Sequence, residues 1–445
     1  MSKDLITPRT LKGFRDYPPA LMLPREHLID TAKAVYREFG FAPIDTPALE
    51  YTEILLGKGS DETDRQLYSF TTSGGRDVTL RFDLTVPLAR FVAQHSGQLG
   101  MPFKRYHVGS VWRGENTQRG RYREFVQCDF DTIGSESALA DVEVPLVMAT
   151  FLPRIGFERF SLRLNHRGIL NGVLERLELG GSSVPVLRAL DKLAKIGPDK
   201  VVEEMQREAG AGEAQAREVL RLGELEGSVE ERLSALAPMV AGTEVGEAGL
   251  QRLQEIFTAL RAAGVGEDHA TLDLSIARGL DYYTGFVYET FLDDLPGIGS
   301  VSSGGRYDDL ASLYTKERLP GVGGSIGIDR LLSGMEELGM IEERQTPAQV
   351  FLPLFDVAHQ AETLALAMEL RQAGLQVELY PDKRKLGAQL KYADRRGFRF
   401  AVIAGESELA AGTAQLKDLA DGSSQELSRG ELADAIRGRL GGAAS

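Results

Sequence analysis

Residues 103–133 read FKRYHVGSVWRGENTQRGRYREFVQCDFDTI, and this stretch decides the fold. Its two ends are rich in aromatic and β-branched residues, and a loop that contains Gly114 and Gly120 separates them. Residues of these types favour β-strands, and a short loop between two such runs is typical of an antiparallel pair. A further strand-like run, VTLRFDL, begins at Val78. The pattern therefore predicts an antiparallel sheet as the scaffold of the first domain.

Helical patterns lie on both sides of this stretch. Residues 25–39 (REHLIDTAKAVYREF) carry apolar side chains at helical spacing, Gly40 ends the run, and a short extended segment with Pro43 and Pro47 follows. After residue 165 the composition shifts to Ala, Leu, Glu and Arg with amphipathic spacing, which predicts a helical insertion at about residues 168–264. Strand character returns after the insertion, so we expect one domain over residues 1–338.

A second domain is expected after a polar, Pro-containing linker at residues 339–348. The strand-like runs VFLPLF, LQVELYP and FRFAVIAG alternate there with amphipathic helices. Alternation of this kind indicates an α/β fold with a partly parallel sheet, which we assign to residues 349–441.

The composition bounds the function. A chain of 445 residues that is 42% hydrophobic and 26% charged favours two or three packed domains. It has no run of about twenty apolar residues and its first residues do not read as a secretory signal, so a cytoplasmic location is expected. The single cysteine excludes an intramolecular disulfide, and the six histidines lack zinc-site spacing. No protein-bound structural metal is expected, and any metal should arrive with a substrate.

The charge pattern limits the kinds of binding partner to expect. A net charge of −14 argues against nonspecific coating of nucleic acid. Two windows oppose this average: residues 104–123 hold six basic residues with Glu115 as the one acid, and residues 383–399 hold seven with Asp394 as the one acid. Each window alone is compatible with a solvated helix face, but two together suggest a polyanion contacted at two places.

Four short segments carry residues suited to ligand chemistry. They are WRGE (112–115) with RGRYREF (119–125), then RGLDYYTG (278–285), SSGGRYD (302–308) and GVGGSIGIDR (321–330). In the first, an arginine can hold a phosphate while Phe125 offers a flat face to a purine; an exposed hairpin with surface arginines is the alternative. Glycine-rich turns beside an arginine suit nucleotide binding, although neither of the last two segments matches a Walker loop or a dinucleotide fingerprint.

The adjacent residues Tyr282 and Tyr283 could either bind a ligand or pack in the core. Adjacent residues on a strand point to opposite faces, so at most one tyrosine should line a given pocket directly unless a twist or bulge intervenes. Aromatic packing is the alternative to ligand binding. The flanking Gly279 and Gly285, with Arg278 at the start of the run, are features expected where backbone approaches a ligand closely.

In this order, the four segments resemble class II aminoacyl-tRNA synthetases, and within that class the histidyl-tRNA synthetase family. The helix and strand that end near Pro47 are similar to motif 1 of the class, residues 111–131 to motif 2, and residues 321–330 to motif 3. RGLDYYTG and SSGGRYD resemble the two segments particular to the histidine enzymes. The resemblance implies an α+β class II catalytic core, with an antiparallel sheet flanked by helices and a helical insertion, plus a C-terminal α/β anticodon-binding domain.

The resemblance also implies a set of ATP-binding residues. Arg113 would hold the α-phosphate and the histidine carboxylate, with Glu115 beside it, and Phe125 would stack on adenine. Arg330 would hold the far side of ATP. Arg278 would stabilise charge on the α-phosphate during attack, the task of a metal ion elsewhere in class II. Magnesium would accompany the β- and γ-phosphates.

For histidine, the resemblance assigns a second set. Asp83, Thr85 and Gln127 would receive the α-ammonium group. Asp131 and Tyr282 would meet the imidazole, with Tyr283 closing the pocket. Some members of the family have glutamate where this chain has Asp83 and Asp131, and the shorter side chains change the reach of the carboxylates rather than their role.

The implied activity is a histidine–tRNA ligase: L-histidine is activated by ATP to histidyl-adenylate and then transferred to the 3′ end of tRNA(His). From charge and position, Gln118 and Arg119 in the motif 2 loop are expected to face the acceptor end, and Arg395 and Arg396 in the basic segment 383–399 the anticodon stem. A homodimer is implied by motif 1. The alternative is a catalytically silent paralogue that senses histidine as regulatory subunit of ATP phosphoribosyltransferase, but Arg113, Arg278, Arg330 and the second domain favour the enzyme.

Overall fold

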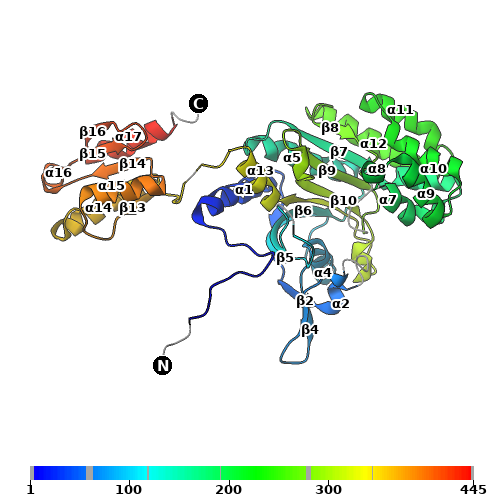
Figure 1. Ribbon diagram of the computed structural model, residues 1–445, viewed down its shortest axis with the longest axis horizontal. Coiled ribbons are helices and arrows are strands. Elements are labelled where there is room, and N and C mark those ends of the chain that lie inside the picture. Colours follow the sequence, from blue (N-terminus) through cyan, green and yellow to red (C-terminus); the bar gives the residue numbers. More distant parts are fainter. Residues whose placement is uncertain are drawn as a thin grey trace. The chain divides into compact units, whose positions relative to one another are not determined.

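A computed structural model describes residues 5–56, 64–117, 120–190, 192–276, 282–342 and 344–441. The chain forms two compact units (Figure 1): unit 1 is Met1–Arg15 with His27–Glu337, and unit 2 is Asp16–Glu26 with Leu338–Ser445. No helix in the described ranges is long and apolar enough to span a membrane.

The strands of unit 1 belong to two sheets. They are β1 (Ala42–Pro43), β2 (Leu49–Tyr51), β3 (Ser69–Thr71), β4 (Asp77–Leu80), β5 (Phe103–Trp112), β6 (Glu124–Ile133), β7 (Phe160–His166), β8 (Ala270–Leu272), β9 (Phe286–Leu292), β10 (Ser302–Tyr307) and β11 (Gly321–Gly327). The main sheet has eight strands in the order β1-β5-β6-β11-β10-β9-β7-β8, and β2-β4-β3 form a small antiparallel sheet. Neighbours from β5 to β7 are antiparallel, whereas β1 and β8 add parallel edges. The predicted antiparallel scaffold is confirmed.

The helices of unit 1 precede, interrupt and follow this sheet. They are α1 (Pro19–Glu38, which begins in unit 2), α2 (Thr52–Leu55), α4 (Thr85–His95), α5 (Ala138–Arg154), α6 (Arg167–Arg176), α7 (Ser183–Leu190), α8 (Leu193–Ile196), α9 (Pro198–Ala209), α10 (Glu213–Leu220), α11 (Val229–Val240), α12 (Glu244–Ala262) and α13 (Ile328–Glu337). Helices α6 to α12 lie between β7 and β8 in the chain and appear in green in Figure 1. Helix α12 packs against α6, α5 and β7, which joins this helical region to the main sheet.

The strands β5 and β6 form the centre of the fold. Their register runs from Phe103 opposite Ile133 to Trp112 opposite Glu124. On one face, Phe130 is fully buried against the ring of Tyr36 from α1, at 5.0 Å between centroids. The Tyr36 hydroxyl donates to the carbonyl of Cys128 at 2.8 Å, which satisfies its polar group inside the apolar core. The opposite face of β6 is therefore available to polar residues.

The two glycine-rich segments are strands rather than phosphate-binding turns. Gly304 on β10 lies opposite Gly324 on β11, and Gly305 lies opposite Gly323. A Cβ on Gly323 would come within 2.2 Å of Asp131 Oδ1, and one on Gly324 within 2.1 Å of the Tyr288 hydroxyl. Glycine is required here because these strands run directly against polar side chains of the sheet. Close packing thus accounts for these glycines, and Gly323 and Gly324 also line the cavity described below.

Unit 2 has its own sheet and core. Its strands are β12 (Val350–Leu352), β13 (Val377–Leu379), β14 (Phe400–Ile403), β15 (Thr413–Asp418) and β16 (Ser424–Ser428), and its helices are α14 (Gln360–Gln372), α15 (Leu386–Arg396), α16 (Glu406–Ala411) and α17 (Arg429–Gly441). The strand order is β13-β12-β14-β15-β16, with β12 parallel to both neighbours and the remaining pairs antiparallel. The predicted partly parallel α/β fold is confirmed.

Candidate active site

A cavity of about 1100 Å³ opens in unit 1 over β6, β10 and β11. Many of the predicted site residues line it although they come from distant parts of the sequence. They are Thr85, Arg113, Glu115, Phe125, Gln127, Asp131, Tyr282, Tyr283 and Arg330. Of the remaining predicted residues, Gln118, Arg119 and Arg278 lie outside the described residues, and Arg395 and Arg396 belong to unit 2.

The predicted ATP-binding residues form one side of this cavity. The Arg113 guanidinium lies 4.4 Å from the ring centroid of Phe82 and 5.1 Å from that of Phe125, and its Nε donates to the Phe82 carbonyl at 3.1 Å. Stacking between two rings holds the planar guanidinium in one orientation.

Arg330 at the start of α13 also faces this side, and its Nη1 donates to the Ser300 carbonyl. Burial lowers the pKa of Arg330, and the nearby charges of Arg121 and Arg113 lower it further. Arg113, Arg121 and Arg330 supply positive charge suited to phosphate groups in a cavity that carboxylates also line.

Two of the predicted histidine-binding residues, Gln127 and Asp131, lie on the cavity-facing side of β6, and Thr85 lies on α4. Side chains at alternate positions of a strand share a face, so Gln127, Asp129 and Asp131 form one row. Gln127 Nε2 donates to Ser325 Oγ at 3.1 Å. Thr85 begins α4, and the side chains of Thr85 and Tyr282 share a hydrogen bond.

Asp83 occupies a different position from the other predicted residues. It is buried and is not among the residues that line the cavity. Its Oδ1 accepts a hydrogen bond from Val86 N at 2.9 Å, which satisfies a donor in the first turn of α4. Burial raises the pKa of Asp83, and the charges of Arg113 and Arg105 oppose that rise.

Asp131 is held by two residues, Tyr307 and Arg105, that were not among the predicted site residues. Its Oδ1 accepts from the Tyr307 hydroxyl, and its Oδ2 lies 2.7 Å from Arg105 Nη2 in an ion pair that is not an aligned hydrogen bond. Arg105 is 0% exposed and Asp131 is 3% exposed. The Asp131 carboxylate, which was predicted to bind the imidazole, is therefore already oriented by Tyr307 and paired with Arg105.

Tyr282 and Tyr283 both line the cavity, although adjacent residues of a regular strand would point to opposite faces. They precede β9 and lie in no strand, so the opposite-face rule does not apply to them. Their rings meet edge to face, with centroids 5.1 Å apart, and Tyr282 meets Tyr307 in the same way at 5.8 Å. Burial raises the pKa of both hydroxyls well above the usual value, so they act as neutral hydrogen-bonding groups.

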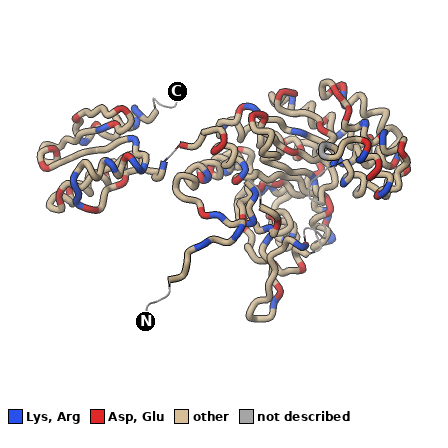
Figure 2. Tube along the Cα trace, viewed as in Figure 1, with Lys and Arg blue, Asp and Glu red and all other residues tan. Residues whose placement is uncertain are grey.

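The first basic window does not form one surface patch. Arg105 is buried in its ion pair, and Lys104 on the neighbouring position pairs with Glu143 at 2.8 Å. Arg113 and Arg121 instead line the cavity. Figure 2 shows basic and acidic residues interspersed along the trace of unit 1. Strand alternation separates Lys104 from Arg105 on β5, whereas Arg113, Arg121 and Arg123 lie in the connection between β5 and β6.

Asp129 is a cavity residue that sequence reasoning missed. It is 2% exposed and lies between Gln127 and Asp131 in the row on β6. Burial raises the pKa of Asp129 to about 7; the charge of Asp131 adds to the rise, and the charge of Arg105 opposes it. The period of two along β6 was the signal that could have identified it.

Asp129→Asn is expected to stabilise the protein in a pH-dependent way. The pKa of this carboxyl is about 7 in the folded chain against 3.8 for the unaffected group, so between pH 4 and 7 folding takes up a proton and stability falls as pH rises. Asparagine does not titrate, so the variant does not lose this stability. The free energy of unfolding of wild type should fall by up to about 1.4 kcal/mol per pH unit relative to the variant. Urea unfolding at pH 5, 6, 7 and 8 measures the free energy of unfolding of both proteins. The difference in favour of Asp129→Asn should increase up to pH 7 and then level off. If the stability difference between Asp129→Asn and wild type were constant over this pH range, it would have to arise from hydrogen bonding and not from the titration of Asp129.

Comparisons with known proteins identify the family of the chain. A family model described as "Histidyl-tRNA synthetase" matches residues 13–331, and one described as "Anticodon binding domain" matches residues 349–439. The chain is 58% identical to the histidine–tRNA ligase of Rhodopirellula baltica, over 95% of this chain and 96% of that protein. The histidine–tRNA ligase of Wolinella succinogenes is 46% identical, over 93% of this chain and 94% of that protein.

Two solved structures are also similar. The histidyl-tRNA synthetase of Nostoc sp. PCC 7120 superposes with a TM-score of 0.89 at 35% identity, over 98% of this chain and 100% of that one. A protein of Bacillus halodurans described as an ATP phosphoribosyltransferase regulatory subunit/histidyl-tRNA synthetase superposes with a TM-score of 0.74 at 25% identity, over 91% of this chain and 100% of that one. These matches confirm the predicted class II fold and favour the enzyme over the regulatory alternative. Since a family model covers most of the chain and a relative is 58% identical over nearly all of it, the chain belongs to the histidyl-tRNA synthetase family.

Proposed function

We propose that the chain activates L-histidine with ATP, releases pyrophosphate and transfers the histidyl group to the 3′ end of tRNA. One observation carries the proposal: the arginines and the polar row of β6, predicted to bind ATP and histidine respectively, line a single cavity. The test is histidine-dependent ATP–pyrophosphate exchange, followed by charging of purified tRNA. A protein that binds histidine but gives neither signal would be a histidine sensor instead.

In the activation step, the histidine carboxylate attacks the α-phosphate and pyrophosphate leaves. No protein nucleophile takes part, so catalysis rests on positioning and on compensation of developing negative charge. Arg113 supplies a fixed guanidinium for that charge, Phe125 stacks on the adenine, and Arg330 contacts the distal phosphates. Magnesium enters with ATP as part of the substrate. Arg278 keeps the role implied by the resemblance, as a prediction from sequence.

Histidine recognition uses both ends of the polar row. Thr85 and Gln127 contact the α-ammonium group. Asp83, which is buried and does not line the cavity, favours this positive group through its negative charge. Asp131 and Tyr282 contact the imidazole, and Tyr283 covers it. A buried donor or acceptor left without a partner costs about 1–3 kcal/mol, so amino acids without two ring nitrogens are rejected.

Unit 2 is proposed to contact tRNA through α15. Arg395 is exposed, whereas Arg396 is half-buried, with its Nη2 3.8 Å from Glu378 Oε2 and its guanidinium 5.8 Å from the ring centroid of Tyr392. Exposed arginines contribute phosphate contacts that depend on salt. Gln118 and Arg119 remain candidates for the acceptor end from sequence alone.

The variant Arg395→Glu/Arg396→Glu is expected to raise the KM for tRNA about tenfold while leaving ATP–pyrophosphate exchange within twofold of wild type. Both assays are run on the same preparation. The matched control is Arg437→Glu, an exposed arginine on α17 that pairs with Asp434. Equal losses in the two assays, or an equal rise in KM for the control, would contradict a tRNA-binding role for α15.

A homodimer is proposed from the resemblance to motif 1. Four large apolar residues near β2, β3 and α2 are exposed in the single chain, which supports an interface there: Leu49, Tyr51, Leu56 and Phe70. Light scattering after size-exclusion chromatography measures the mass, and a monomer at micromolar concentration would refute the proposal. The cytoplasmic location stays a prediction from sequence.

A further inference from the structure

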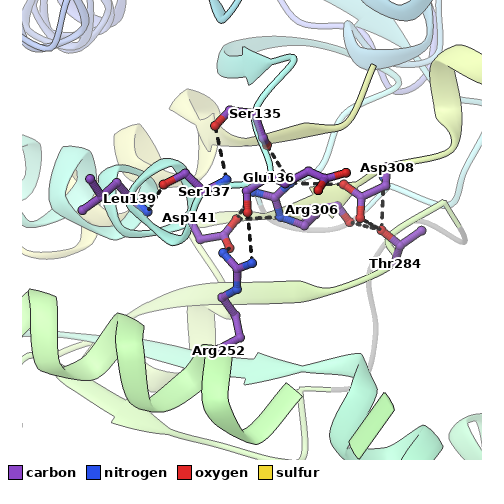
Figure 3. Close-up of polar contacts among 9 residues, drawn as sticks. All are labelled: Ser135, Glu136, Ser137, Leu139, Asp141, Arg252, Thr284, Arg306 and Asp308. Atoms are coloured by element: carbon purple, nitrogen blue, oxygen red, sulfur yellow. Dashed lines mark hydrogen bonds and ion pairs between the residues drawn. The ribbon is translucent and has the colours of Figure 1, made fainter. Parts of the chain in front are cut away.

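Arg306 lies on the side of β10 that faces away from the cavity. The next residue, Tyr307, lines the cavity and donates to Asp131, and strand alternation turns Arg306 toward α5 instead. Figure 3 shows its guanidinium directed at Asp141. The arginine of the SSGGRYD segment is therefore not one of the cavity cations.

A buried ionic cluster surrounds this guanidinium. Arg306 Nε donates to Asp141 Oδ1 at 2.8 Å, and its Nη1 donates to the Ser135 carbonyl at 2.9 Å and to Asp308 Oδ1 at 3.2 Å. Asp141 is 0% exposed and Arg306 is 5% exposed. Ion pairs this deep are costly to rearrange, because breaking one leaves a charge without compensation.

The cluster reaches into the helical region between β7 and β8. Arg252 of α12 places its Nη1 3.2 Å from Asp141 Oδ2, and its Nη2 donates to the Glu136 carbonyl at 3.0 Å. Asp141 thus lies between two arginines, one on the main sheet and one on the insertion (Figure 3). The position of α12 and the position of Arg306 are linked through one carboxylate.

The cluster also holds the segment that carries the two tyrosines. Thr284, the residue after Tyr283, donates its N–H to the Arg306 carbonyl at 2.7 Å. Its hydroxyl donates to Asp308 Oδ2 at 3.2 Å and accepts from Asp308 N at 3.1 Å. Asp308 is in turn held by the Arg306 guanidinium.

On the other side of this segment, Arg167 at the start of α6 donates from Nη1 to the Tyr283 carbonyl at 2.5 Å. Its backbone N donates to the Gly285 carbonyl at 2.9 Å. Residues 283–285 are therefore fixed from both sides, and Arg167, like Arg252, belongs to the insertion.

We propose that Arg306 is a positioning residue for histidine binding, and that Asp141 makes this positioning depend on how Arg252 of the insertion is docked. The inference rests on the proposed role of Tyr282 and Tyr283 in the histidine pocket. Arg306 touches no substrate. It holds Thr284 directly and through Asp308, and this keeps the preceding tyrosines at the cavity wall. Three of the residues proposed to bind ATP, Arg113, Phe125 and Arg330, lie on other elements, and only Arg278 belongs to the same segment as the tyrosines. The effect on histidine should therefore exceed the effect on ATP.

Thr284→Val tests the first link, because valine keeps the volume and the backbone N–H but removes the hydroxyl that binds Asp308. We expect the Kd for histidine by calorimetry and the KM for histidine in ATP–pyrophosphate exchange to rise about fivefold. The KM for ATP should stay within twofold. Thr290→Val on β9 is the control: Thr284 is half-buried and Thr290 is fully buried, but the Thr290 hydroxyl has no hydrogen-bond partner among the described residues, so the KM values of this variant should not change.

Arg252→Gln tests the second link from outside the catalytic core. We expect about a threefold rise in the KM for histidine with an unchanged KM for ATP. Arg261→Gln, an exposed substitution on the same helix, serves as control. If wild type gives normal exchange but both Thr284→Val and Arg252→Gln match it in histidine KM, or if they only lower thermal stability, the inference is wrong. If wild type gives no histidine-dependent exchange, the proposed function itself fails.

Discussion

Arg113→Gln is expected to slow histidine-dependent ATP–pyrophosphate exchange by about 10²–10³-fold, because a preorganised donor to the charge that develops at the α-phosphate is lost. Stacking on Phe82 and Phe125 holds the guanidinium, and its Nε is already bound to the Phe82 carbonyl. The two Nη groups are left to meet the phosphate and the histidine carboxylate. Glutamine cannot supply that charge.

Two further variants make this prediction specific. Arg113→Lys keeps the charge but not the planar, two-pronged geometry, so we expect it to recover less than a tenth of the wild-type rate. Arg163→Gln is the matched control: Arg163 lies 4.3 Å from the ring centroid of Phe291 and pairs with Asp273 at 3.1 Å, yet it does not line the active-site cavity. Exchange by Arg113→Gln within tenfold of wild type would remove Arg113 from the catalytic role.

Sequence patterns were sufficient for the elements that consist of contiguous residues. The strands around residues 103–133 follow from aromatic and β-branched content, and the second domain follows from the alternation of apolar strands and amphipathic helices. Residues from motif-like segments were brought together in one cavity as the resemblance implied. Local propensity and motif spacing carry this information because each depends on neighbours in the chain.

Cross-strand partners could not be predicted in the same way. The hydroxyl of Tyr307 and the carboxylate of Asp131 are 176 residues apart in sequence, and their contact depends on the β6–β11–β10 order. Arg105 was counted within a basic window, although the register opposite Asp131 buries it. Register and strand order are tertiary properties, and they decide which charges become internal ion pairs. The two tyrosines illustrate the same limit, since their common direction depends on their lying outside a strand.

Asp131→Ala is expected to lower the free energy of unfolding by about 3–5 kcal/mol and to remove measurable histidine activation. The stability loss arises because Arg105, which is 0% exposed, would keep its charge without the carboxylate 2.7 Å away. The activity loss arises because the imidazole would lose its proposed partner. Glu143→Ala is the control for stability: its ion pair with Lys104 is partly exposed, so the cost should stay below about 1 kcal/mol.

The double variant Arg105→Met/Asp131→Asn separates the two effects. Methionine removes the buried charge at nearly constant volume, and asparagine can still accept from the Tyr307 hydroxyl, so most of the lost stability should return. Histidine activation should stay at least about 100-fold below wild type, because a neutral amide replaces the carboxylate that the imidazole requires. Urea unfolding and pyrophosphate exchange measure the two quantities independently. If stability and exchange returned together, the role of Asp131 would be to neutralise Arg105, and the recognition of the imidazole would have to be assigned to Tyr282 and its neighbours.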